Sequence, residues 1–157
     1  MFELSQTEKK HLRAASQHPH GHLPQGVSER VLGFLYEERL IVRFDSDGYV
    51  ITSVASALID RRKGPFLITP EGRLALLSKP QQRALTHETG EDGQLAPRTP
   101  WATVNSLAQM RLVQFLDAHG AVQATDGDTG GTRGQRNAPH LTEMGRKVAE
   151  LVRDRTP

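Results

Sequence analysis

The chain has 157 residues, a formal charge of +2 at neutral pH and no cysteine. The lack of cysteine excludes disulfides and thiolate metal sites, and no apolar run reaches the roughly 18 residues that a membrane-spanning helix needs. We therefore expect a cytoplasmic protein with no membrane partner, in which any affinity for nucleic acid depends on where the basic residues lie.

The start of the chain predicts two helices joined by a short extended segment. Ser5 is a suitable N-cap with Glu8 three residues later, so a helix is expected over residues 6–18. Residues 21–24 follow as the extended piece. Ser28 then opens a second helix, whose apolar positions keep helical spacing.

After the second helix the apolar spacing becomes that of strands. Residues 40–44 and 49–54 are expected to be strands, with the turn signal Asp47-Gly48 between them. A returning strand over residues 65–69 follows. Thr69 then caps a third helix, whose first position is a proline, where a missing N–H costs nothing.

The second half of the chain repeats this order. Ser78 caps its first helix and residues 93–96 form its short strand. Thr99 or Pro100 starts its second helix, and a hairpin spans residues 112–141. The order of elements is therefore the same in both halves.

Individual residues also match between the halves. The pairs are Leu4 with Leu77, Ser5 with Ser78, Leu12 with Leu85, Gly21 with Gly93, Leu23 with Leu95, Leu32 with Val104, and Leu35 with Leu107. Units of this length are larger than solenoid repeats, so we predict two copies of one domain, residues 1–76 and 77–157. Leu35 should then occupy the same place as Leu107, and Thr69 the same place as Thr142.

The order of helix, short strand, helix, two-stranded hairpin with a basic loop and final helix resembles the winged helix-turn-helix family, especially its bacterial regulators. The residues that carry the resemblance are Ile68-Thr69 and Leu141-Thr142, Gly72-Arg73 and Gly145-Arg146, and Arg39-Leu40-Ile41 and Arg111-Leu112-Val113. The chain departs from the family in having no short helix before the second helix. The resemblance implies an α+β, mostly helical fold of two tandem winged-helix domains, each with a small antiparallel β-hairpin wing.

The resemblance also implies that the second helix of each copy reads the major groove of DNA. In the first copy the outward positions are expected to be Glu29, Arg30, Tyr36, Glu37 and Glu38, an acidic majority that phosphate repels. In the second copy they are expected to be Thr103, Asn105, Ser106 and Gln109, which include amides suited to adenine edges. We expect the second copy to be the better DNA reader, the alternative being that these are simply solvated helix faces.

Both predicted wings carry basic residues at similar places. They are Arg61, Arg62 and Lys63 in the first copy and Arg133 and Arg136 in the second, and Arg98 precedes the second copy's reading helix. Arginine on such a loop can enter a narrow minor groove or contact phosphates. We predict that these six residues contact DNA, the alternative being that hairpin tips are simply polar.

Four histidines cluster in the first copy. They are His11, His18, His20 and His22, and the alternate spacing of the last three could bring imidazoles to one metal ion. The second copy has Ala84, Glu91, Gly93 and Gln94 at about these places. We therefore predict no metal site and no cofactor, but an exposed loop whose charge rises below about pH 6.5.

The sequence contains no phosphate-binding loop, nucleophile elbow or paired metal-ligand motif, so we predict no enzymatic activity. We expect a transcriptional regulator or replication accessory factor that binds double-stranded DNA. The alternative is a winged-helix assembly module that binds no DNA directly and acts through a homodimer or another protein partner. The near-neutral charge and the acidic helix favour this alternative, and the recurring arginines favour DNA.

Overall fold

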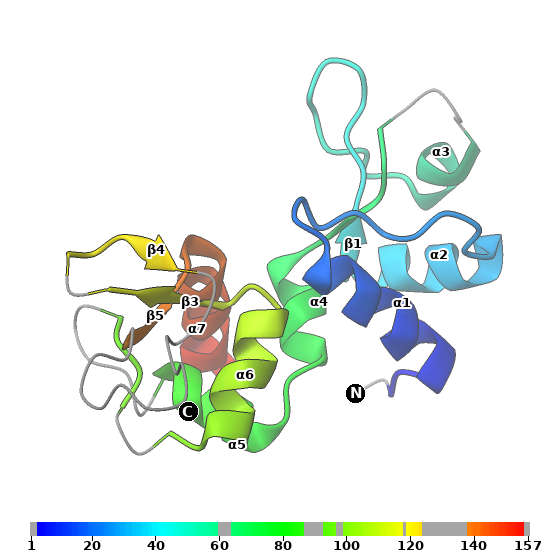
Figure 1. Cartoon of the computed structure of the whole chain (residues 1–157). Coiled ribbons are helices and arrows are strands. Elements are labelled where there is room, and N and C mark those ends of the chain that lie inside the picture. Colours follow the sequence, from blue (N-terminus) through cyan, green and yellow to red (C-terminus); the bar gives the residue numbers. More distant parts are fainter. Residues whose placement is uncertain are drawn as a thin grey trace. The chain divides into compact units, whose positions relative to one another are not determined.

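The computed structural model describes residues 3–59, 64–86, 93–96, 99–117, 119–123 and 138–155. The chain divides into two compact units, unit 1 (residues 1–76) and unit 2 (residues 77–157), so the boundary falls where the second copy of the repeat begins (Figure 1). The fold is α+β and mostly helical, and each unit holds one small antiparallel sheet. Within the described ranges, no helix is both long and apolar enough to span a membrane.

The first two helices of unit 1 begin at the predicted caps. In front of α1 (Gln6–Gln17), the Ser5 hydroxyl accepts the N–H of Glu8 at 3.2 Å, and the Glu8 carboxylate accepts the N–H of Ser5 at 3.4 Å. This reciprocal pair is the predicted capping box. The second helix, α2 (Glu29–Glu37), starts from Ser28, as predicted.

The sheet and the last helix of unit 1 enclose its core. The strands β1 (Ile41–Val42) and β2 (Leu67–Ile68) pair antiparallel, and His22 makes a further bridge to β2. The last helix, α4 (Pro70–Ala75), begins from the predicted cap Thr69. Buried apolar residues of this unit include Leu12, Ala15, Leu35, Leu40, Ile41, Ala57 and Ile68.

The expected strand over residues 49–54 forms only in part. Residues 43–45 and 49–51 are joined by two backbone bonds, Asp45 N–H to Tyr49 O (2.9 Å) and Ile51 N–H to Arg43 O (3.0 Å). Val50 makes only an isolated bridge with Phe44, and the chain then turns into α3 (Val54–Ile59), as Figure 1 shows. The extended segment ends there, where the Ser53 hydroxyl accepts the N–H of Ser56 at 3.3 Å at the start of the helix.

Unit 2 contains the corresponding elements and a larger sheet. They are α5 (Lys79–Thr86), α6 (Trp101–Gln109), β3 (Val113–Leu116), β4 (Val122–Gln123), β5 (Ala138–Leu141) and α7 (Glu143–Arg155). The sheet has three strands in the order β4-β3-β5, where the sequence predicted a two-stranded hairpin. Gln94 bridges to His140 on β5, just as His22 bridges to β2 in unit 1.

The same aspartate-centred turn follows β1 and β3. The Asp45 carboxylate accepts the N–H groups of residues 47 and 49, both at 2.9 Å. The Asp117 carboxylate accepts those of residues 119 and 121, at 2.8 and 3.0 Å. Gly48 and Gly120 in these turns have φ of 86° and 81°, which glycine adopts without strain. The predicted turn signal at Asp47-Gly48 is confirmed.

The Arg-Leu pair after the second helix of each unit is a helix C-cap. The bonds that define it are Leu40 N–H to Leu35 O (2.9 Å) and Leu112 N–H to Leu107 O (3.0 Å). They close a Schellman turn, which requires left-handed backbone at the preceding residue. Arg39 and Arg111 occupy that position with φ of 62° and 61°. In both units the leucine of the repeated pattern thus donates the bond that closes the turn.

The last helix of each unit is attached to this turn by matching bonds. They are Thr69 Oγ1 to Arg39 O (2.8 Å) and Thr142 Oγ1 to Arg111 O (2.7 Å). Each threonine hydroxyl also accepts the N–H of a glycine three residues later, at 3.0 Å. Leu35 and Leu107 are both fully buried. The predicted equivalence of these leucines, and of Thr69 with Thr142, is confirmed.

Those glycines permit a very close approach between backbone segments. A Cβ on Gly72 would lie 2.3 Å from the carbonyl oxygen of Leu40, and a Cβ on Gly145 would lie 2.1 Å from that of Leu112. The same two carbonyls accept the N–H groups of the threonines at 3.0 Å. The Thr-x-x-Gly segment thus attaches the last helix of each unit to the turn after the second helix.

Tyr36, expected on the outer face of α2, is buried instead. Its hydroxyl donates a hydrogen bond to the carbonyl oxygen of Ile51, in the segment that leads to α3. Burial raises the pKa of the Tyr36 phenol above its ordinary value of 10.0, although Arg43 nearby acts in the opposite direction. The folded state of unit 1 therefore favours the neutral phenol.

This shift predicts a loss of stability in alkali. The pKa of Tyr36 is higher in the folded than in the unfolded chain, so its contribution is complete below pH 10 and declines as the pH rises beyond that value. Tyr36→Phe should cost unit 1 about 1 kcal/mol near neutral pH and reduce the alkaline decline. Urea unfolding of both proteins, followed by NMR at neutral pH and above pH 10, measures this. An unchanged alkaline decline in the variant would contradict it.

Candidate nucleic-acid interface

Three exposed side chains form a line along α6. They are Trp101, Asn105 and Gln109, which are spaced four residues apart and therefore share one face of the helix. The opposite face buries Val104 and Leu107 in the core of unit 2. Core packing therefore fixes the direction in which the three outer side chains point, and we call these three residues the α6 stripe.

The other two polar residues predicted on this face are less accessible. Thr103 and Ser106 are half-buried, because each lies next to a core position of the helix. The Ser106 hydroxyl also donates to the carbonyl oxygen of Ala102 at 2.9 Å. The polar surface of α6 is therefore narrower than the sequence predicted.

Trp101 is a candidate contact that sequence reasoning misses. It is 53% exposed, and its ring stacks on Phe115 of β3 with centroids 6.1 Å apart and planes inclined by 30°. The strand thus supports the indole while leaving much of it in solvent. The available signal was the four-residue spacing from Trp101 to Asn105 in a predicted helix.

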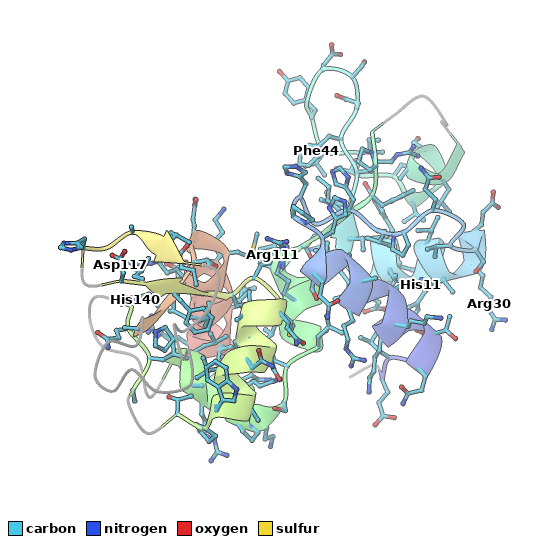
Figure 2. The ribbon with its side chains drawn as sticks, in the orientation of Figure 1. His11, Arg30, Phe44, Arg111, Asp117 and His140 are labelled. Carbon is cyan, nitrogen blue, oxygen red and sulfur yellow. The ribbon has the colours of Figure 1, made fainter. Side chains whose placement is uncertain are left out.

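The equivalent positions on α2 are acidic, whereas the α6 stripe is uncharged. Its members are Glu29, Gly33 and Glu37, so two carboxylates stand where unit 2 has an indole and an amide. Arg30 is also exposed and points away from the body of unit 1 (Figure 2), whereas Glu38 is half-buried. Glu29 and Glu37 would both repel phosphate, as the sequence indicated.

The two ends of α6 offer further groups to an anion. Pro100 precedes the helix and makes no side-chain capping bond, whereas the Ser28 hydroxyl accepts an N–H at the start of α2. First-turn N–H groups that are not capped favour phosphate. Arg111 is exposed just beyond the other end (Figure 2), and α6 itself contains no charged residue.

The predicted wing contacts lie outside the described residues. These are Arg61, Arg62, Lys63, Arg133 and Arg136, and Arg98 also falls outside them. Their contact with DNA therefore stays a prediction.

Three of the four histidines of unit 1 gather around the connector after α1. The ring centroids of His18 and His22 are 4.6 Å apart, and the centroid of His20 lies 6.0 Å from that of His18 and 5.7 Å from that of His22. The rings of His18 and His22 stack with planes inclined by 17°, and His18 Nδ1 accepts the N–H of His20 at 3.0 Å. Across the described residues, no three His, Cys, Asp or Glu side chains are grouped so that they could hold a metal ion.

Comparison of the chain with protein families, curated proteins and solved structures finds no match.

Proposed function

We propose that the protein is a tandem winged-helix DNA-binding protein, acting as a transcriptional regulator or replication accessory factor, and that α6 is its reading helix. The observation that carries this proposal is the α6 stripe on a helix without charge. A side-chain amide can bond both the N6 and N7 atoms of adenine, a contact worth about 1–3 kcal/mol of discrimination per base.

Each part of α6 has a distinct role in this proposal. Asn105 and Gln109 contact base edges in the major groove, and Trp101 packs on a thymine methyl group. The first-turn N–H groups and Arg111 contact phosphates, which position the helix without specifying sequence. The basic residues of the two predicted wings add electrostatic affinity.

We assign unit 1 a different role, because two glutamates of α2 occupy the positions at which α6 would contact DNA. Glu29 and Glu37 both project into solvent from the face equivalent to the α6 stripe. We therefore assign sequence reading to unit 2. One chain thus carries two units of the same construction, of which one reads sequence.

A comparison of matched variants tests this assignment. A preferred duplex is first selected from a random pool, and binding to it and to a scrambled duplex is measured by fluorescence anisotropy at one salt concentration. Trp101→Ala with Asn105→Ala and Gln109→Ala should weaken binding to the preferred duplex by about 10- to 100-fold and leave scrambled binding nearly unchanged. Glu29→Ala with Glu37→Ala, at the equivalent positions of unit 1, should leave the preference intact.

Two results would contradict the proposal. Equal losses on both duplexes would show that the α6 stripe does not read sequence. The second result is that the protein does not bind random duplex at low salt, or that added salt does not weaken its binding. Either finding would show that the electrostatic attraction that DNA binding requires is missing. That second result would favour the assembly-module alternative, in which the exposed Trp101 serves as a protein contact.

A further inference from the structure

Unit 1 has an apolar groove beside the end of α2. Its volume is about 500 Å³, and it lies between α2, β1, the segment before α3 and the start of α4. Its apolar lining includes Ile41, Val42, Val50, Ile51 and Val54. The volume is within the range of binding sites for small ligands and peptide side chains.

Exposed apolar side chains also lie on the turn that leads into this groove. Tyr49 is 73% exposed, Val50 is 49% exposed and Phe44 is 37% exposed. These are three of the five large exposed hydrophobic side chains in the described part of the chain. Figure 2 shows Phe44 at the base of this turn, and Asp45 holds the turn through its two bonds to N–H groups. The turn that carries these apolar side chains is thus held by side-chain hydrogen bonds, and clusters of exposed apolar side chains mark interaction sites.

The charge at this groove is negative. Glu37 and Glu71 line it together with Arg39, and neither carboxylate has an ion-pair partner among the residues that the structure describes. By the equivalence of the two units, the corresponding residues of unit 2 are Gln109 and Met144. The two acids therefore belong to unit 1 alone.

We propose that this groove binds a basic, apolar peptide segment of another protein. Lysine or arginine side chains of the peptide pair with Glu37 and Glu71, and its apolar side chains occupy the groove and pack against Tyr49. The carboxylates disfavour DNA at this place. Val50 lines the groove, and Tyr49 next to it in the chain is exposed, so an extended peptide can contact both, which suits a peptide better than a compact small molecule. This inference does not depend on DNA binding by unit 2.

The test uses the full chain and three dye-labelled peptides of twelve residues. The first alternates leucine and lysine, the second alternates leucine and glutamate, and the third alternates serine and lysine. Anisotropy should show binding of the leucine-lysine peptide at least 10-fold tighter than that of either other peptide. NMR shifts should fall on residues of the groove, Val42, Val50 and Ile51 among them.

Variants then locate the contact. Glu37→Gln with Glu71→Gln should weaken binding of the leucine-lysine peptide at least 10-fold, and so should Tyr49→Ser. Glu3→Gln with Glu29→Gln removes the same net charge from exposed positions outside the groove and should leave binding within 2-fold. Equal loss in this control pair, equal binding of the leucine-glutamate peptide, or a self-association of the chain that covers the groove and blocks the peptide would each overturn the proposal.

Discussion

Replacing Gly72 by alanine is expected to unfold unit 1, and replacing Gly145 by alanine is expected to unfold unit 2. The new Cβ would lie 2.3 or 2.1 Å from a backbone carbonyl oxygen, far inside van der Waals contact. Relief requires the last helix to move away from the Schellman turn, which breaks the threonine bonds that attach it. We expect a loss of about 4 kcal/mol in each case, at the upper end of single-residue effects.

NMR spectra of the two variants measure this outcome unit by unit. Each variant should lose the dispersed amide resonances of its own unit and keep those of the other. Gly64→Ala is the control, because a Cβ at Gly64 meets no atom within 4 Å and should change little. Wild-type stability in Gly72→Ala would show that this close approach is not needed. Loss of both units from either substitution would show that they do not fold independently.

The arginine that follows each of these glycines should contribute more to the free energy of unfolding in unit 1 than in unit 2. Arg73 is only 5% exposed, and its Nη1 donates to the carbonyl oxygen of Ser16 at 3.1 Å, which ties α4 to the end of α1. Arg73→Ala removes a buried charge-assisted bond and leaves a cavity, so we expect a loss of about 3 kcal/mol. Arg146 is exposed, and Arg146→Ala should cost about 1 kcal/mol or less.

Urea denaturation of the two variants, with each unit followed separately by NMR, gives both values. Arg73→Lys serves as a second comparison, because it keeps the charge but not the planar group that reaches Ser16, and it should recover less than half of the loss. Similar losses for Arg73→Ala and Arg146→Ala would show that the burial of Arg73 does not add to the stability of unit 1.

Local rules predicted the helix starts of this protein well. Ser5, Ser28 and Thr69 act as caps because a cap depends on the few residues that follow it. The internal match between the halves likewise predicted which residues share a place in the core. These features depend on sequence neighbours or on a comparison inside the chain.

Features that depend on contacts between distant segments were not predictable in this way. Tyr36 was expected in solvent, but it is buried, and its hydroxyl donates to a carbonyl group fifteen residues later. One local signal was missed as well, because the Ser53 hydroxyl accepts the N–H of Ser56 where the chain enters α3. For the α6 stripe, the amides Asn105 and Gln109 were predictable from helical spacing. The accessibility of Trp101 was not, because it depends on where Phe115 supports the indole.

The spacing between equivalent residues indicates how the chain arose. Leu12 and Leu85 are 73 residues apart, Gly21 and Gly93 are 72 apart, and Thr69 and Thr142 are again 73 apart. One residue was therefore lost or gained between the first helix and the short strand, and another before the final strand. An internal gene duplication leaves this record when length changes survive only between the hydrogen-bonded elements. Because residues 21–44 and 93–116 have kept equal length, either stretch has the length needed to replace the other in a chimera.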